Sequence, residues 1–532
     1  MLNWQITVDT DEGVKALEGQ SEITEGNGTL SIVCDLPEGR IKKVKALLEL
    51  SIQDDEKIFM NGYQTWTNCP EYGKKSRIRG LNGLPQFMIN KFGFDRYGDY
   101  HFVNYPHKMG ITHGFSWCYF RSGDKYLLIA STDEKNGYTM FTYDSDKGQL
   151  GIVRDCSGVK CGGEFHAFDL YFAEGTEDQV FDGWFDAMTV HADAKPLRGY
   201  SSWYNRYEDI TEDTIRTDLN GCKTLLSKGD LFQIDDGWEP AVGDWLEPDE
   251  KKFPDGLKVL ADEIHEAGFI AGLWLAPFVC RNGSKLMLEH PDWLLQVKGK
   301  PWSCGSNWGG FYSLDIDKPE VLDYLRRVFD RVLNEWGFDL VKLDFLYGAA
   351  PFGTETESRA GRMIRGMDFL REICGDKLIL GCGVPVMPAF GRVDYCRVSC
   401  DVGLDWDDKP LMRIIHRERV STKQAIENTI FRRQLNGRAY LSDPDVFFLR
   451  EENLSLTAEQ KQLLAQVNAL LGGVLLTSDD PSSYTDAQRE AYRSLLHLQE
   501  AEQIRVDWDK HIITYLLDGK IQTVKLPGEW FR

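Results

Sequence analysis

Two features that would direct a chain to membranes or nucleic acids are missing from this sequence. No uninterrupted apolar run approaches the roughly 18 residues that a membrane-spanning helix needs. Basic residues are in the minority, with 61 Lys and Arg against 83 Asp and Glu and a formal net charge of -22. A field of that sign repels phosphate backbones and anionic lipid head groups. We therefore expect neither nucleic acid nor a membrane surface as a partner.

The sequence also lacks the marks of an exported, disulfide-linked protein. Its 12 cysteines are spread along the chain without a Cys-x-x-Cys pair, and several lie within apolar runs, where thiols behave as small hydrophobic residues. Residues 1–9 contain no basic segment followed by an apolar run, so no secretory signal is expected. These features predict a cytoplasmic location, where cysteines stay reduced.

What is present is the composition of a large globular protein. The 532 residues are 42% hydrophobic, 12% aromatic and 27% charged, far from the composition of disordered chains. At roughly one domain per 150 residues, this length predicts three or four domains, or fewer if one of them is a barrel.

Residues 1–192 have the pattern of an antiparallel β-sandwich. Short apolar runs, such as 30–34 and 126–130, are separated by turns that contain glycine: Ser122-Gly123, Asn136-Gly137 and Lys147-Gly148. Glycine reaches a positive φ without steric cost, which favours hairpins. The aromatic-rich segment 61–69, which contains Trp66, is expected to be a loop. The sequence is compatible with either of two roles for this loop: packing at the edge of the sandwich, or a function.

Residues 193–484 change to strand-like runs that alternate with helical patterns. Eight runs are counted: 200–204, 231–234, 269–275, 340–343, 378–382, 395–400, 439–442 and 473–477. None is followed by the Gly-x-Gly-x-x-Gly fingerprint that opens many dinucleotide-binding sheets. This alternation predicts a (β/α)8 TIM barrel. Residues 485–532 predict a small C-terminal β-containing segment, with a hairpin that turns at Asp518-Gly519.

Active sites of such barrels lie at the carboxyl ends of the strands. The residues expected there are aromatic or acidic, apart from one Lys, one Arg and one Cys: Trp203, Tyr204, Asp235, Asp236, Trp274, Lys342, Asp344, Cys382, Arg397 and Asp401. Flat rings stack on the C–H faces of a sugar and carboxylates accept from its hydroxyls, so this set indicates a neutral polyhydroxyl ligand. Capping of the following helices is the alternative role of each aspartate, but it explains neither the tryptophans nor Lys342.

Glycoside hydrolysis needs two carboxyl groups in opposite protonation states. Strand alternation points Lys342 and Asp344 in the same direction, and a nearby ammonium favours an ionised carboxylate, which makes Asp344 a candidate nucleophile. Asp401, two strands further around the barrel, is the candidate for the second carboxyl group. Arg397 is the obvious cation close to it in the sequence.

A set of short motifs joins these residues in order along the chain. They are Ser202-Trp-Tyr204, Phe232-Gln-Ile-Asp-Asp-Gly-Trp238, Gly272-Leu-Trp-Leu-Ala-Pro-Phe278, Glu289-His-Pro-Asp-Trp293, Lys342-Leu-Asp-Phe345, Gly381-Cys-Gly383 and Arg397-x-x-x-Asp401. With these motifs the chain resembles, over nearly its whole length, the retaining α-galactosidases of glycoside hydrolase family 36. The resemblance implies hydrolysis of terminal α-D-galactosyl residues from oligosaccharides by double displacement, without metal or cofactor.

The resemblance also implies roles for single residues. Asp344 would be the nucleophile and Asp401 the acid/base. The other candidates would bind the sugar: Asp235 and Asp236 at its 4- and 6-hydroxyls, Lys342 and Arg397 near the reacting carbon, Cys382 near the 2-hydroxyl, Trp203 and Trp274 as walls, Trp66 at the mouth, and Tyr204 and Gly383 within their motifs. The oligomeric state stays open, a homo-oligomer included.

Three alternatives are weighed against this function. An α-N-acetylgalactosaminidase would use the same fold, since Cys382 is small enough to leave room for an acetamido group. A metal-dependent barrel enzyme would recruit His or Glu ligands, but His265 and His290 lie in a helix and in the segment after a helix rather than at strand ends. A non-catalytic sugar-binding protein would lack one carboxyl group of the pair, whereas both positions are Asp.

Overall fold

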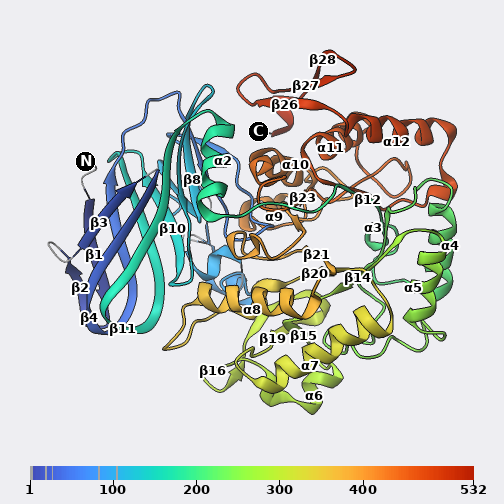
Figure 1. Cartoon of the computed structure of the whole chain (residues 1–532), viewed down its shortest axis with the longest axis horizontal. Coiled ribbons are helices and arrows are strands. Elements are labelled where there is room, and N and C mark those ends of the chain that lie inside the picture. Colours follow the sequence, from blue (N-terminus) through green and yellow to red (C-terminus); the bar gives the residue numbers. More distant parts are fainter. Residues whose placement is uncertain are drawn as a thin grey trace.

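The computed structural model describes residues 4–17, 21–26, 28–78, 80–81, 84–96, 98–103 and 106–531. Residues 1–3, which begin the predicted sandwich and the segment examined for a secretory signal, lie outside these ranges. Within them, no helix is both long and apolar enough to cross a membrane. Figure 1 shows an antiparallel β domain on the left beside a larger part in which helices surround a parallel sheet.

The N-terminal domain contains an antiparallel sheet of eleven strands. Its two longest strands, β4 (Thr29–Glu49) and β11 (Gln149–Gly175), pair with each other, and the register of this pairing shifts at three places. The other strands join them: β1 (Trp4–Thr10), β2 (Gly13–Ala16), β3 (Ser21–Gly26), β5 (Lys57–Met60), β6 (Glu71–Gly73), β7 (Ile111–Phe115), β8 (Trp117–Ser122), β9 (Lys125–Ser131) and β10 (Tyr138–Asp144). Bulges of this kind bend long strands, so one sheet folds into two halves.

The two halves of this sheet face each other across a hydrophobic core. Ile6 and Val44 of one half share a buried cluster with Ile32, Phe120 and Phe168 of the other. The predicted sandwich is therefore present as a folded sheet. The hairpins predicted at Ser122-Gly123 and Lys147-Gly148 are confirmed, but the one at Asn136-Gly137 was wrong, because β9 pairs with β8 and β11 while β10 pairs with β7 and β11.

The all-β prediction for residues 1–192 was wrong in two segments, which form the helices α1 (Gln86–Phe92) and α2 (Glu177–Met188). Helix α2 buries Val180, Phe181, Trp184 and Phe185. This spacing places the four side chains on one helical face, so the apolar pattern of the segment is helical rather than alternating.

All eight predicted parallel strands are present. In chain order they are β12 (Leu197–Ser201), β13 (Leu231–Ile234), β14 (Ile270–Leu275), β20 (Leu340–Leu343), β21 (Leu378–Gly381), β22 (Tyr395–Arg397), β23 (Leu441–Asp443) and β25 (Val474–Thr477). Each pairs in parallel with its chain neighbour up to β23, and β12 pairs with β25. A ninth, β24 (Val446–Phe447), continues from β23 after Pro444 and pairs with β25. Residues 441–447 thereby join the two ends of the sheet into a ring.

The first and sixth predicted strands differ from the structure by three residues, and the boundaries of the other strands differ by at most two. The first strand was expected at 200–204 but ends at Ser201, because Ser202 already has helical dihedral angles and Trp203 begins the short helix α3 (Trp203–Arg206). The sixth was expected to reach Cys400 but ends at Arg397. Both differences move side chains from the sheet onto its carboxyl rim, where a barrel site lies.

Helices and small sheets surround this ring (Figure 1). The helices are α4 (Glu212–Cys222), α5 (Leu257–Glu266), α6 (Lys285–Glu289), α7 (Pro319–Asp330), α8 (Arg359–Cys374), α9 (Pro410–Ile415), α10 (Thr422–Phe431) and α11 (Ala458–Leu471). An insertion after β14 forms the strands β15 (Val279–Arg281), β16 (Gln296–Val297), β17 (Lys300–Pro301), β18 (Ser303–Gly305) and β19 (Phe311–Ser313).

The C-terminal part begins with helix α12 (Asp486–Leu498) and continues into three antiparallel strands, β26 (Glu502–Asp507), β27 (Ile512–Leu517) and β28 (Lys520–Lys525). The predicted hairpin is confirmed, with Asp518 and Gly519 at its turn and both at positive φ. The domain boundaries at residues 192 and 484 stay predictions.

Candidate active site

A cavity of about 460 Å³ opens at the carboxyl end of the parallel sheet. Eight of the twelve predicted site residues line it: Trp66, Trp203, Asp235, Asp236, Trp274, Lys342, Asp344 and Asp401. Seven of them follow or end barrel strands, and Trp66 comes from the loop after β5 of the sandwich. The site is thus built by both domains.

Four predicted residues do not line this cavity and lie behind its wall: Tyr204, Cys382, Gly383 and Arg397. The Tyr204 hydroxyl donates to Asp445 Oδ2. Gly383 has a φ of +54°, and a Cβ there would come within 2.8 Å of the Trp66 ring and 2.9 Å of the Phe345 nitrogen. Only glycine fits at that position, because Trp66 packs directly over it.

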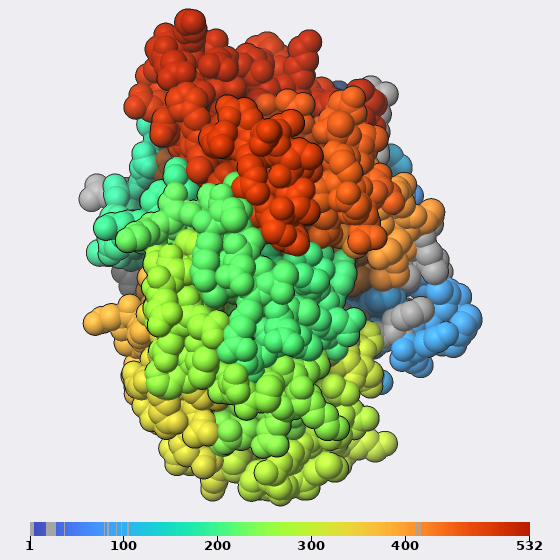
Figure 2. Space-filling view, turned by 90° about the vertical axis from the view of Figure 1, so that its right-hand side faces the viewer, coloured from blue at the N-terminus to red at the C-terminus, as the bar shows by residue number. Residues whose placement is uncertain are grey.

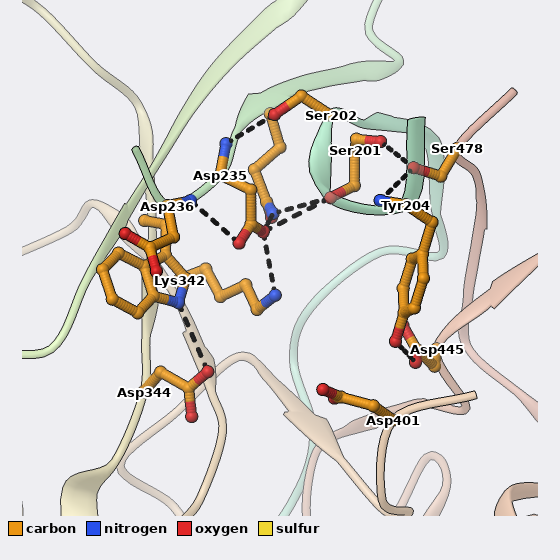
Figure 3. A network of polar contacts seen from close by, with 12 residues as sticks. Ser201, Ser202, Tyr204, Asp235, Asp236, Lys342, Asp344, Asp401, Asp445 and Ser478 are labelled. Carbon is orange, nitrogen blue, oxygen red and sulfur yellow. Dashed lines mark hydrogen bonds and ion pairs between the residues drawn. The ribbon is translucent and has the colours of Figure 1, made fainter. Parts of the chain in front are cut away.

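Asp344 lies at the buried end of the cavity. Its carboxyl group accepts from Trp274 Nε1 at 3.3 Å and from the Phe345 backbone N–H at 2.7 Å. Burial raises the pKa of Asp344 above its ordinary value, Lys342 opposes this increase, and the charge of Asp401 adds to it. Figure 3 shows the carboxyl groups of Asp344 and Asp401 directed toward the same space.

Asp401 has a different environment, because its side chain is 37% exposed and is held by a cation. Arg397 Nη2 donates to Asp401 Oδ1 at 3.0 Å and also lies 2.9 Å from Asp445 Oδ2. The buried guanidinium of Arg397 therefore fixes Asp401 from behind, which matches the sequence expectation that Arg397 is its neighbouring cation.

The ion pair of Lys342 differs from the sequence expectation. Lys342 Nζ donates to Asp235 Oδ2 at 2.9 Å, and it acts on Asp344 through its charge. Asp235 is anchored further by Gln233 Nε2 at 2.6 Å and by Ser201 Oγ at 3.3 Å (Figure 3). This network holds the carboxylate of Asp235 in one orientation at the cavity wall.

Asp236 is paired with a second carboxyl group, Glu239, which the sequence did not single out. Burial and the adjacent Glu239 raise the pKa of Asp236, and burial raises the pKa of Glu239. Two buried carboxyl groups in contact do not both ionise readily, so the pair retains a proton at neutral pH. Trp308 Nε1 donates to Asp236 Oδ2 at 2.9 Å.

Trp308 is the main functional candidate that sequence reasoning missed. It lies in the insertion between β18 and β19, has a φ of +53°, and lines the cavity. The adjoining Gly309-Gly310 pair is a turn signal, but Trp308 does not follow a barrel strand, so the rule that sites lie at strand ends does not point to it. Other cavity residues away from strand ends were missed for the same reason: Phe94, Glu208, Met412, His416, Glu418 and Val420.

The loop that carries Trp66 is held by the barrel. Glu418 accepts from Gln64 Nε2 at 2.7 Å and from Thr67 Oγ1 at 2.6 Å, on either side of Trp66. Arg432, fully buried, donates to Asn61 Oδ1 and to the carbonyl oxygens of residues 64, 65 and 398. These contacts fix Trp66 relative to β22 and explain how a sandwich residue reaches a barrel site.

Among the residues that the structure describes, no group of three or more His, Cys, Asp or Glu side chains is arranged to hold a metal ion. All 12 cysteines are free thiols.

Comparisons with known proteins agree with this geometry. A family model, Melibiase, matches residues 189–360. The α-galactosidase Mel36A of Lactobacillus acidophilus is 34% identical over 151 residues, which cover 27% of this chain and 20% of that protein. The α-galactosidase AgaA of Geobacillus stearothermophilus is 33% identical over 152 residues, with the same coverage of 27% and 20%. The matched segments thus span one fifth of the length of these curated relatives.

A solved structure matches far more of the chain. It is TtGalA, an α-galactosidase from Thermus thermophilus in complex with p-nitrophenyl α-D-galactopyranoside, with 26% identity and a TM-score of 0.76 over 95% of this chain and 98% of that one. The chain is therefore similar to α-galactosidases, in sequence over part of the barrel and in fold over nearly its whole length.

Proposed function

We propose that this protein is a retaining, exo-acting α-galactosidase that removes terminal α-D-galactosyl residues from oligosaccharides. The observation that carries the proposal is the pair Asp344 and Asp401, which line one cavity together with four tryptophans and the carboxyl groups of Asp235 and Asp236. Relatives have been solved with stachyose and raffinose bound, which supports an oligosaccharide as the substrate class.

The roles of the two aspartates follow from their positions. Asp344 lies at the buried end, where Trp274 and the Phe345 N–H stabilise its charge, so it suits the nucleophile. Asp401 is half-buried and can reach both a departing alcohol and an incoming water, as the acid/base must. The reaction needs an ionised nucleophile, and the charge of Lys342 favours the ionised form of Asp344 by opposing the increase in its pKa.

No cofactor is required by this mechanism. We keep the cytoplasmic location as a prediction, which the free thiols support. The acetamido alternative depended on space beside Cys382, and Cys382 does not line the cavity, so no observation favours it over galactose.

The test is a side-by-side assay of aryl α-galactoside, α-N-acetylgalactosaminide and α-glucoside, with NMR of the sugar first released. The galactoside should be hydrolysed fastest, and the first product should be the α anomer, as a retaining enzyme requires. Faster hydrolysis of the α-N-acetylgalactosaminide would show that the protein is an α-N-acetylgalactosaminidase instead of an α-galactosidase. An initial β anomer would exclude the double displacement.

A further inference from the structure

Asp445 is a buried carboxyl group behind the site that the proposed mechanism does not use. It follows β23 and Pro444, and its φ of +78° is a left-handed conformation that Asp and Asn adopt more readily than most other residues. Its N–H donates to Asp443 Oδ1 at 2.9 Å, and its carbonyl oxygen accepts from Asn468 Nδ2 at 3.0 Å. These contacts hold the strained backbone in place. Such strain is common at functional sites, so the contacts of this side chain are relevant to the mechanism.

The Asp445 carboxylate binds the groups that hold Asp401. Its Oδ2 accepts from the N–H of Val402, the residue directly after Asp401, at 2.8 Å, and it lies 2.9 Å from Arg397 Nη2. The same Nη2 donates to Asp401 Oδ1 at 3.0 Å. The Tyr204 hydroxyl also donates to Asp445 Oδ2, and Figure 3 shows this contact beside Asp401. Asp445 therefore fixes Asp401 in two ways, through its backbone and through its cation.

These contacts join parts of the barrel that are far apart in the sequence, because Tyr204 lies 241 residues before Asp445. The green and the orange-red parts of the chain also lie against each other on the face shown in Figure 2. Asp445 itself does not line the cavity, so it can act on a substrate only through other residues.

The titratable groups whose charge acts on Asp445 or on its partners come from several elements packed against it: Tyr204, Tyr207, Arg397, Cys400, Asp401 and Asp443. Burial raises the pKa of Tyr204, Tyr207 and Cys400, which therefore stay neutral at neutral pH. Of the others, Arg397 is the cation and the remaining three are carboxyl groups. Arg397 Nε lies 3.9 Å from Asp443 Oδ2, further than Nη2 lies from Asp445. Asp445 therefore offsets more of the Arg397 charge than Asp443 does.

We propose that Asp445 is a positioning residue for the acid/base, which holds Arg397 and offsets its charge so that Asp401 can keep a proton. The inference rests on the proposed function, and in particular on Asp401 as the acid/base. A guanidinium that faced Asp401 alone would favour the ionised carboxylate, whereas a general acid must be protonated when the glycosidic bond breaks. The negative charge of Asp445 opposes this effect, since it neutralises part of the charge on Arg397 and repels negative charge on Asp401.

The variant Asp445→Asn tests this role, because it removes the charge, keeps an oxygen that can accept from the Val402 N–H, and tolerates a positive φ. Two substrates with the same galactosyl group separate protonation from other effects. One is 2,4-dinitrophenyl α-galactoside, whose leaving group departs with little protonation, and the other is galactose α-linked to the 6-position of glucose, whose leaving group needs it.

In Asp445→Asn, kcat/KM for the disaccharide should fall by at least about tenfold and that for the dinitrophenyl galactoside by less than about threefold. The basic limb of the pH profile for the disaccharide should move to lower pH, because the acid/base loses its proton more readily beside an unbalanced Arg397. A merely structural role would lower both values together. Equal losses on the two substrates, or an unshifted basic limb, would overturn the proposal.

The matched control is Asp479→Asn, just after β25 and outside the cavity. Asp479 is also buried, and its Oδ2 accepts from the Tyr484 hydroxyl at 2.8 Å and from the Leu449 N–H at 2.6 Å. This variant should leave the ratio of the two kcat/KM values and the basic limb unchanged.

A second variant, Asp445→Gly, keeps the test decisive if the asparagine variant does not fold, because glycine adopts a φ of +78° without steric cost. It should give the same loss on the disaccharide, the same smaller loss on the dinitrophenyl galactoside and the same shift of the basic limb. Failure of the parent enzyme to hydrolyse both substrates would instead reject the proposed function, and this inference with it.

Discussion

The ammonium group of Lys342 lies 2.9 Å from Asp235 Oδ2, and this ion pair is buried in the wall of the candidate active site. The Lys342 ammonium thus acts on two carboxyl groups. It contacts Asp235 directly, and its charge lowers the pKa of Asp344. Burial raises the pKa of Asp344, which disfavours its ionised form, and the charge of Lys342 opposes this increase. In the proposed mechanism, this one side chain would therefore couple substrate binding at Asp235 to activation of the nucleophile Asp344.

Replacement of Lys342 should therefore change the pH dependence as well as the rate. In Lys342→Met the pKa of Asp344 should rise further, because the opposing positive charge is gone, and the acid limb of kcat/KM should move to higher pH. The maximal rate should fall by at least about a hundredfold, since Asp235 is left as a buried, unpaired charge. Lys461→Met, a buried lysine that donates to the Arg450 carbonyl outside the cavity, is the control and should keep the original profile. An unshifted acid limb would contradict the coupling.

The two catalytic roles can be separated by chemical rescue. Asp344→Gly should abolish turnover, and azide should restore it with formation of the β-galactosyl azide, because the anion enters from the face of the missing nucleophile. Asp401→Gly should give the α-azide and should retain first-step cleavage of aryl substrates with good leaving groups, which need little protonation. NMR of the azide products distinguishes these outcomes. The role assignment fails if both variants yield the same anomer.

Stability should depend on pH through a carboxyl group outside the site. Glu134 is buried beside Ser116 and Thr139, and burial raises its pKa to about 7. Between its unfolded value near 4.5 and about 7, the folded state retains a proton that the unfolded state releases, so stability should fall as pH rises through this window. The loss is on the order of 3 kcal/mol for a shift of this size.

Glu134→Gln tests this dependence, since the amide can accept from the Thr139 N–H and donate to Ser116. The fall in Tm between pH 5 and pH 8 should be smaller in the variant than in the parent protein. Identical pH slopes would show that Glu134 does not carry the effect.

The sequence predicted the fold more completely than it predicted the site. Apolar runs that alternate with helical patterns located the eight parallel strands, and Trp203 to Asp401 followed from the rule that barrel sites lie at strand ends. This rule does not predict which residues from other parts of the chain contact the strand ends. Glu239 meets Asp236 through a turn, Trp308 arrives from an insertion, and Glu418 contacts Gln64 across 354 residues. Periodicity describes local structure and contains no information on which distant loops meet.

The neighbouring residues Asp235 and Asp236 provide the sharpest test of the site, because their side chains have different partners. Asp235 contacts the Lys342 ammonium, whereas burial and the adjacent Glu239 raise the pKa of Asp236, which accepts from Trp308. Asparagine resembles a protonated aspartic acid, with one acceptor oxygen and a donor that can face Glu239. Asp236→Asn should therefore be the milder change and should keep most of the Tm.

Asp235→Asn leaves the Lys342 ammonium buried without its partner, a change that typically costs about 3–5 kcal/mol. It should lower Tm by several degrees and reduce kcat/KM for aryl α-galactoside far more than Asp236→Asn does. Thermal unfolding and steady-state kinetics of the two variants, measured together, check both parts. Equal losses would mean that the two aspartates carry the same charge, and the proton assigned to Asp236 and Glu239 would have to be abandoned. A greater loss in Asp236→Asn would reverse the assignment, since only an ionised Asp236 would suffer more from the amide.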